Sequence, residues 1–131
     1  MDTRHLPKAT AALLLAGVLL ADAIPASAAQ TLRSVPRATD LSVRLTIDSF
    51  DGQNGRRMPV FDGYRPHIVF YPPDGDVNCA VRLASAEAQI EPGSTAEVTL
   101  SCASDIRIYA DSGRFTVYEG GRVIGHGVVA H

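Results

Sequence analysis

The chain has 131 residues, of which 46% are hydrophobic and 20% are charged, and its formal net charge is −2 at pH 7. This length suits one domain with one hydrophobic core. The near-balance of charge argues against nucleic acid as a general partner, because such binding needs clustered positive charge to displace counterions.

Residues 1–29 have the three parts of an export signal. Arg4 and Lys8 form a basic start, Ala9 to Ala21 is an apolar run, and the small residues that follow allow cleavage after Ala28 or Ala29. The run is shorter than the about 20 residues of a membrane span. We therefore expect a cleaved signal peptide, a periplasmic or secreted protein, and no membrane span after cleavage. An uncleaved membrane anchor is the alternative.

Residues 30–40 are expected to be a linker, and residues 41–131 the folded domain. Leu41–Phe50 alternates strictly between apolar and polar residues, which predicts a strand with one buried face. Tyr64–Tyr71 is a second predicted strand, ended by a Pro-Pro-Asp-Gly turn. The further strands expected are Val77–Leu83, Ala96–Ala103, Ile106–Tyr109, Arg114–Glu119 and Arg122–Val129.

The segment Ala84–Ile90 fits either a helical turn or a bulged strand, and both readings stay open. The predicted strands are separated by turns roughly every ten residues, and no convincing helix follows the signal. The pattern therefore predicts an all-β fold, either a small closed barrel or a sandwich.

The two cysteines, Cys79 and Cys102, fall on the predicted inner faces of their strands. An exported protein meets an oxidising compartment, so we expect a disulfide between them. Closing a loop of about 24 residues would stabilise the fold by roughly 3.5 kcal/mol. Two unpaired core thiols are the alternative. No CxxC or HxxxH spacing accompanies them, and we expect no metal.

The stretch Gly113–Val129, GRFTVYEGGRVIGHGVV, has the pattern of a β-hairpin in which Gly120-Gly121 forms the turn. The sequence of this stretch resembles that of the closing hairpin of the third domain of bacterial elongation factor Tu. Earlier in the chain, Pro59-Val60-Phe61 and the intact Gly63-Tyr64-Arg65-Pro66 also resemble that domain, as does the turn at Pro92-Gly93. These landmarks occur in the family's order from about Leu41 to Val129.

This resemblance implies a small six-stranded antiparallel β-barrel. In the family the domain packs on its two sister domains, meets the exchange factor and contacts aminoacyl-tRNA. By position, Arg65, Glu119 and Gly120 match residues near the RNA backbone, where an arginine can clamp a phosphate. A structural reading is open for two of these residues: Arg65 can pair with a carboxylate, and the turn itself requires Gly120.

The chain departs from the family at two histidines. His67 replaces the glutamine that usually follows Gly-Tyr-Arg-Pro, and His126 lies inside the Gly-x-Gly of the hairpin. If their strands are adjacent, the two could approach each other, with Asp62 or Glu119 as a third metal ligand. Isolated histidines on strands are more often surface residues. We therefore treat His67 and His126 as candidate ligand contacts and expect no metal site.

No phosphate-binding loop and no nucleophile elbow occur in the sequence. We therefore expect no GTP, no cofactor and no enzymatic activity. The expected function is that of a non-catalytic exported binding module for a protein or other ligand of the cell envelope. Contacts are expected at the apolar segments Val60-Phe61 and Ile68–Tyr71. The alternative is a translation-related cytoplasmic factor that contacts tRNA or a ribosomal partner without its own GTPase.

Overall fold

A computed structural model describes residues 31–71, 76–109 and 113–130. Within these ranges the regular secondary structure consists of strands, and none of these residues belongs to a helix long and apolar enough to cross a membrane. The strands are β1 (Leu32–Val35), β2 (Asp40–Ile47), β3 (Val60–Phe61), β4 (His67–Tyr71), β5 (Asp76–Arg82), β6 (Gln89–Ile90), β7 (Thr95–Cys102), β8 (Ile106–Tyr109), β9 (Arg114–Glu119) and β10 (Arg122–Val129).

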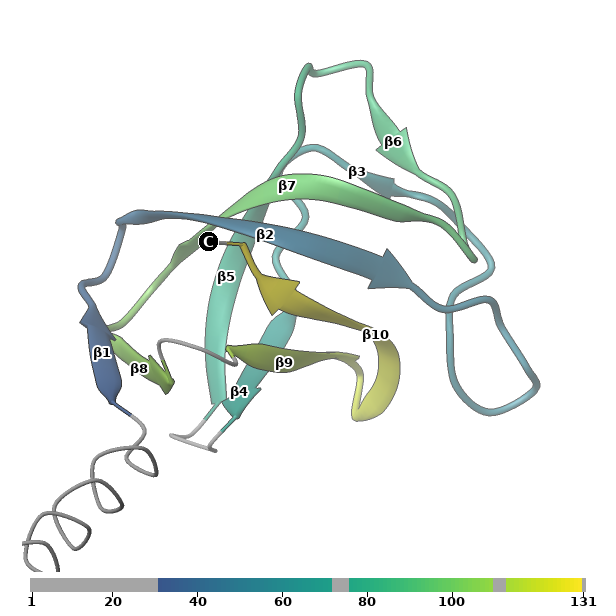
Figure 1. Ribbon diagram of the computed structural model, residues 1–131. Helices are drawn as coiled ribbons and strands as arrows, with labels where there is room; N and C mark the ends of the chain where they lie inside the picture. The colour runs from purple at the N-terminus through teal and green to yellow at the C-terminus, as the bar shows by residue number, and fades with distance from the viewer. Residues whose placement is uncertain (1–30, 72–75, 110–112, 131) are drawn as a thin grey trace, which may run out of the picture. The chain divides into compact units, whose positions relative to one another are not determined.

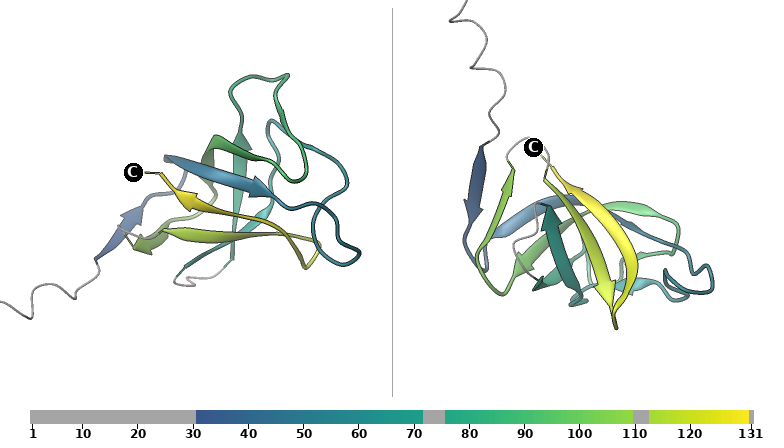
Figure 2. Two further views of the ribbon diagram at one scale, coloured as in Figure 1. Left: turned by 45° about the vertical axis from the view of Figure 1, so that its right-hand side comes forward. Right: turned by 90° about the horizontal axis from the view of Figure 1, so that it is seen from below.

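Six of these strands form a closed barrel in the order β10-β2-β7-β5-β4-β9 (Figure 1). Every neighbouring pair is antiparallel, including β2 with β10, which closes the barrel between its first and last strands. Figure 2 shows the same strands from two further directions. The prediction of a six-stranded antiparallel barrel is thus confirmed.

The core follows from the period-two pattern of the sequence. Val43, Leu45 and Ile47 of β2 are buried, while the residues between them face outward or lie at intermediate depth. Phe70 of β4 and Phe115 of β9 meet inside the barrel, with ring centroids 5.4 Å apart. Alternating strands therefore give the barrel a continuous apolar interior.

The cysteines lie directly opposite each other on β5 and β7 and form a disulfide, which confirms the predicted pairing. Both side chains are buried, and their Cα atoms are 3.9 Å apart. The covalent bond joins two strands that are already neighbours in the barrel.

Two short ribbons lie outside the barrel ladder. Ile106–Tyr109 is a strand as predicted, but it pairs with β1, which lies within the stretch expected to be a linker. Ala84–Ile90 is mostly turn and bend, and its last two residues form β6, which pairs with β3. These pairings join segments far apart in the chain, so local patterns do not indicate them.

The second predicted strand begins later than expected. Residues 65 and 66 lie outside the ladder, β4 starts at His67, and Tyr64 makes only an isolated bridge with Val81. Pro66 has no N–H group to donate and restricts the residue before it, which explains the delayed start.

The Gly-x-Gly of the hairpin is required by close packing. A Cβ atom at Gly127 would lie 2.3 Å from Phe115 Cζ and 2.5 Å from the Arg44 carbonyl oxygen, and one at Gly125 would lie 2.4 Å from the Thr46 carbonyl oxygen. These separations are too short for a side chain. The two glycines therefore let β10 lie close to β2 and to the core.

Candidate functional site

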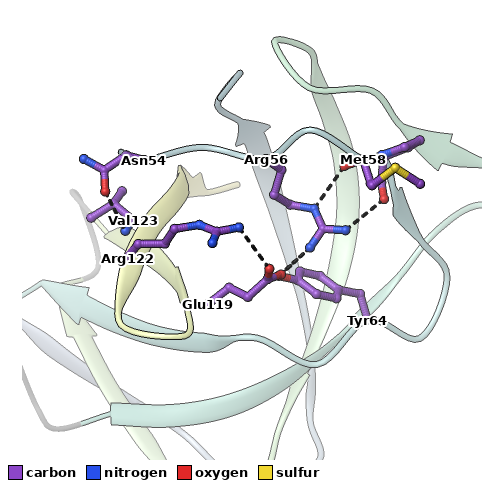
Figure 3. Close-up of polar contacts among 8 residues, drawn as sticks. Asn54, Arg56, Met58, Tyr64, Glu119, Arg122 and Val123 are labelled. Carbon is purple, nitrogen blue, oxygen red and sulfur yellow. Dashed lines mark hydrogen bonds and ion pairs between the residues drawn. The ribbon is translucent and has the colours of Figure 1, made fainter. Parts of the chain in front are cut away.

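The hairpin between β9 and β10 places Glu119 at the edge of the barrel. Gly120 and Gly121 form its turn with φ values of 58° and 81°. Glycine adopts this left-handed region without the steric cost that a Cβ atom brings, as a two-residue primed turn requires. The turn brings Glu119 and Arg122 onto the same side of the hairpin, where an Arg122 nitrogen lies 3.4 Å from a Glu119 oxygen (Figure 3).

The other oxygen of Glu119 accepts two hydrogen bonds, one from Arg56 and one from the hydroxyl group of Tyr64 (Figure 3). Arg56 has further partners in its own loop: Nε donates to the Met58 carbonyl at 3.0 Å and Nη2 to the Pro59 carbonyl at 3.1 Å. The network therefore links the loop before β3, the bridge residue Tyr64 and the end of β9.

Partial burial strengthens this network. The Arg56 side chain is only 15% exposed, and its guanidinium group lies 4.8 Å from the centroid of the Tyr64 ring. Burial raises the pKa of Tyr64 far above its usual value, and the hydrogen bond to Glu119 and the charge of that carboxylate add to the shift. The Tyr64 hydroxyl group thus stays protonated and donates to Glu119. Both carboxylate oxygens of Glu119 contact side chains of the chain itself.

A hollow of about 380 Å³ lies beside the network, and we call it the arginine pocket. Arg57 is exposed and its guanidinium carbon lies 4.0 Å from the centroid of the Phe50 ring. Met58 is 63% exposed. The pocket is lined by Phe50, Arg56, Arg57, Met58, Glu119 and Arg122.

A second hollow, of about 420 Å³, lies on the outer surface of β4, β9 and β10, and we call it the outer groove. Tyr71 and Val128 are exposed there, at 52% and 43%, and Arg114 lies between them in the strand pairing. The Arg114 guanidinium carbon is 5.3 Å from the centroid of the Tyr71 ring. The groove is lined by Val69, Phe70, Tyr71, Arg114, Phe115, Thr116, His126, Gly127 and Val128.

The remaining candidate residues lie apart from one another. Arg65 is exposed, and its side chain has no ion pair or hydrogen bond with any described residue. His67 begins β4 and is paired with Tyr118, whereas His126 lies on β10 with Nδ1 3.3 Å from an oxygen of Asp48.

The two histidines do not come together, because β9 lies between their strands and they belong to different cross-strand rows. The condition for a shared metal site is therefore not met. Among residues 31–71, 76–109 and 113–130, no group of three His, Cys, Asp or Glu side chains is arranged to hold a metal ion.

Each apolar segment expected to make contacts divides into a buried and an exposed part. Val60 is fully buried, whereas Phe61 is 51% exposed. Ile68 and Phe70 are buried in the core, and Tyr71 is the exposed residue of its segment. The alternation of a strand explains this division.

Sequence reasoning missed Arg56, Arg57 and Arg114. Arg56 and Glu119 are 63 positions apart, and only closure of the barrel brings them together. Arg114 and Tyr71 are opposite each other in the β4–β9 ladder. The contacts of Arg56 with Glu119 and of Arg114 with Tyr71 each join distant segments, so no local motif signals them.

The comparison with known families agrees with this geometry. The family model of the elongation factor Tu C-terminal domain matches residues 36–131, which is more than half of the chain. That domain is not the catalytic part of the factor, and no GTP-binding domain is present in these 131 residues. The closed barrel, the Gly63–Pro66 segment and the Glu-Gly-Gly-Arg hairpin place the chain in the elongation factor Tu C-terminal domain family.

Proposed function

We propose that the chain is a non-catalytic binding module that works outside the cytoplasm and holds a protein or other ligand of the cell envelope. The signal-like composition of residues 1–29 supports export. The outer groove supports binding, and one observation carries the proposal: Tyr71, Arg114 and Val128 form a single cross-strand row with both apolar members exposed.

This row has the composition of an interface centre. Tyrosine and arginine are enriched among residues that dominate binding energy, and here they lie in one row with the exposed side chain of Val128. The Tyr71 ring supports the Arg114 guanidinium group, so part of the entropy cost of fixing that side chain falls away. A ligand that covers Tyr71 and Val128 would therefore also meet a positioned hydrogen-bond donor.

Export is tested by cell fractionation with mass determination of the recovered chain. We expect a periplasmic or secreted form that begins at Ala29 or Gln30. An unprocessed cytoplasmic form would contradict the proposal and favour a role in translation.

The groove is tested with the tagged chain as bait in an envelope extract. Tyr71→Ser and Arg114→Ala should each weaken capture of the bound ligand by about tenfold or more, as loss of a central interface residue does. Arg82→Ala is the control, because Arg82 is exposed on β5 and does not line the groove. Capture that is equal for all four baits would exclude the groove as the binding surface.

Two exposed features favour the alternative, a factor that contacts tRNA. Arg65 has a free guanidinium group with respect to the described residues, and the Gly120-Gly121 turn is exposed. Retention on immobilised tRNA should then fall with salt and weaken in Arg65→Ala. Absence of retention at low salt would remove this alternative.

A further inference from the structure

The arginine pocket holds more positive charge than its own residues neutralise. Three arginines and one carboxylate line it. The pair Arg56 and Glu119 is partly buried and mutually compensated. Arg57 has no ion pair with a described carboxylate, and Arg122 reaches the second oxygen of Glu119 only at 3.4 Å.

Asp51, an acidic residue of the same loop, already has its own hydrogen-bond donors. Asp51 accepts hydrogen bonds from the backbone N–H groups of Asn54 at 2.8 Å and Gln53 at 2.9 Å. These bonds, that from Asn54 first, lower the pKa of Asp51 and keep its carboxylate charged within its own turn. The positive charge of the pocket is therefore available to a negative group from outside.

Arg57 is positioned to receive such a group. Its guanidinium carbon lies 4.0 Å from the centroid of the Phe50 ring, a separation at which the cation is attracted to the aromatic ring. A guanidinium group supported on its face keeps the N–H donors along its edge, and these match the two oxygens of a carboxylate. Phe50 therefore orients Arg57 before any partner arrives.

The pocket also offers apolar surface beside these charges. Met58 is 63% exposed, and Phe50 is partly exposed. Methionine and aromatic side chains together with arginine are typical of the centres of protein–protein interfaces. Recognition of a charge alone would not need this apolar component.

We propose that the arginine pocket binds an acidic peptide segment of a partner protein, one that presents a carboxylate to Arg57 and Arg122 and an apolar side chain to Met58. A protein partner fits better than nucleic acid, because the chain carries a net charge of −2 and two available arginines give a small electrostatic footprint for a phosphate backbone. The surface is distinct from the outer groove, since the two hollows share no lining residue.

The test starts from a phage-displayed library of random peptides selected on the full chain. Selected peptides should combine Asp or Glu with a large apolar residue, and their labelled synthetic forms should bind in fluorescence anisotropy. Arg57→Ala and Arg122→Ala should each weaken the affinity by about tenfold or more, as the loss of a charge-assisted hydrogen bond does. Versions of the peptides with Gln and Asn in place of Glu and Asp should lose binding similarly.

Three further variants make the outcome specific. Arg57→Lys keeps the charge but loses the planar group, and it should recover only part of the affinity. Arg82→Ala, an exposed arginine outside the pocket, should bind as the unmodified chain does. Arg114→Ala should leave peptide binding unchanged, so that failure of the outer groove and failure of the arginine pocket are separable.

Two results would overturn the proposal. Selected peptides without acidic residues, or with affinities that Arg57→Ala and Arg122→Ala leave unchanged, would show that the pocket does not recognise carboxylates. Retention on tRNA that is lost in the same two variants, without acidic-peptide binding, would assign the pocket to nucleic acid instead. Thermal melting of each variant shows whether a loss of binding comes from loss of the fold.

Discussion

Arg56 donates through all three nitrogens of its guanidinium group. The acceptors are two carbonyl oxygens of its own loop, Glu119 at the end of β9 and, at 3.3 Å, the hydroxyl oxygen of Tyr64. A partly buried cation costs desolvation energy, which such hydrogen bonds offset. Glu119 provides the matching negative charge. Glu119, which matches a family position near the RNA backbone, thus has a structural role here: it fixes the loop of Arg56 against the hairpin.

Tyr64→Phe tests the network at its hydroxyl group. The raised pKa of Tyr64 means that folding favours its protonated form, so its stabilisation is present below the unfolded value of about 10 and is lost as pH rises above it. We expect Tyr64→Phe to lower the free energy of unfolding by roughly 1 kcal/mol at neutral pH. The difference from the unmodified chain should shrink at alkaline pH.

Urea unfolding from about pH 8 to about pH 11, a range that spans the pKa of tyrosine in the unfolded chain, measures this difference. Tyr118→Phe is the matched control, because Tyr118 lies on β9 and no hydrogen bond of its hydroxyl group with a described residue is present. If the difference in free energy of unfolding between Tyr64→Phe and the unmodified chain stays constant across this pH range, the role assigned to the hydroxyl group is contradicted.

At the scale of the element, the close packing of β10 depends on the absence of side chains at Gly125 and Gly127. Gly127→Ala should destabilise the fold by about 2 kcal/mol, since overpacking forces the neighbouring atoms to move. The added methyl group would meet the Phe115 ring and a carbonyl oxygen of β2, and the backbone oxygen cannot turn aside. Urea midpoints at neutral pH measure the change.

Gly121→Asn provides the comparison within the same hairpin. Gly121 has positive φ and open space around its Cα, and asparagine tolerates that backbone conformation better than most residues. The urea midpoint of Gly121→Asn should therefore move less than that of Gly127→Ala. The reverse order would mean that turn geometry, rather than close packing, limits the hairpin.

The elements that could be predicted are those whose signal is local. Strict alternation along Leu41–Phe50 predicts β2, although the strand ends at Ile47, and Gly120-Gly121 predicts the closing turn. The residues 32–35 and 84–90 carry no such pattern, and their ribbons form only against remote segments. The candidate sites depend on the same remote pairing, so the sequence predicted Glu119 and missed its partner Arg56.

For the whole molecule, the disulfide is the one covalent restraint seen among the described residues. Its half-cystines are 23 positions apart, and restricting that loop in the unfolded chain should stabilise the barrel by roughly 3.5 kcal/mol. Reduction should therefore lower the urea midpoint. The double variant Cys79→Ala/Cys102→Ala should melt near the reduced chain and should not respond to reductant; an unmoved midpoint in the unmodified chain would contradict the stabilising role.

The pairing of β2 with β10 also determines which part of the chain closes the barrel. Val43, near the start of the barrel, has Val129 as its partner, so the barrel can close only when residues 122–129 are available to pair with β2. A topology dominated by such distant pairs folds slowly compared with one built from local contacts. Any form of the chain that lacks residues 122–129 therefore lacks the strand that closes the barrel, and β2 and β9 each have an unpaired edge in such a form.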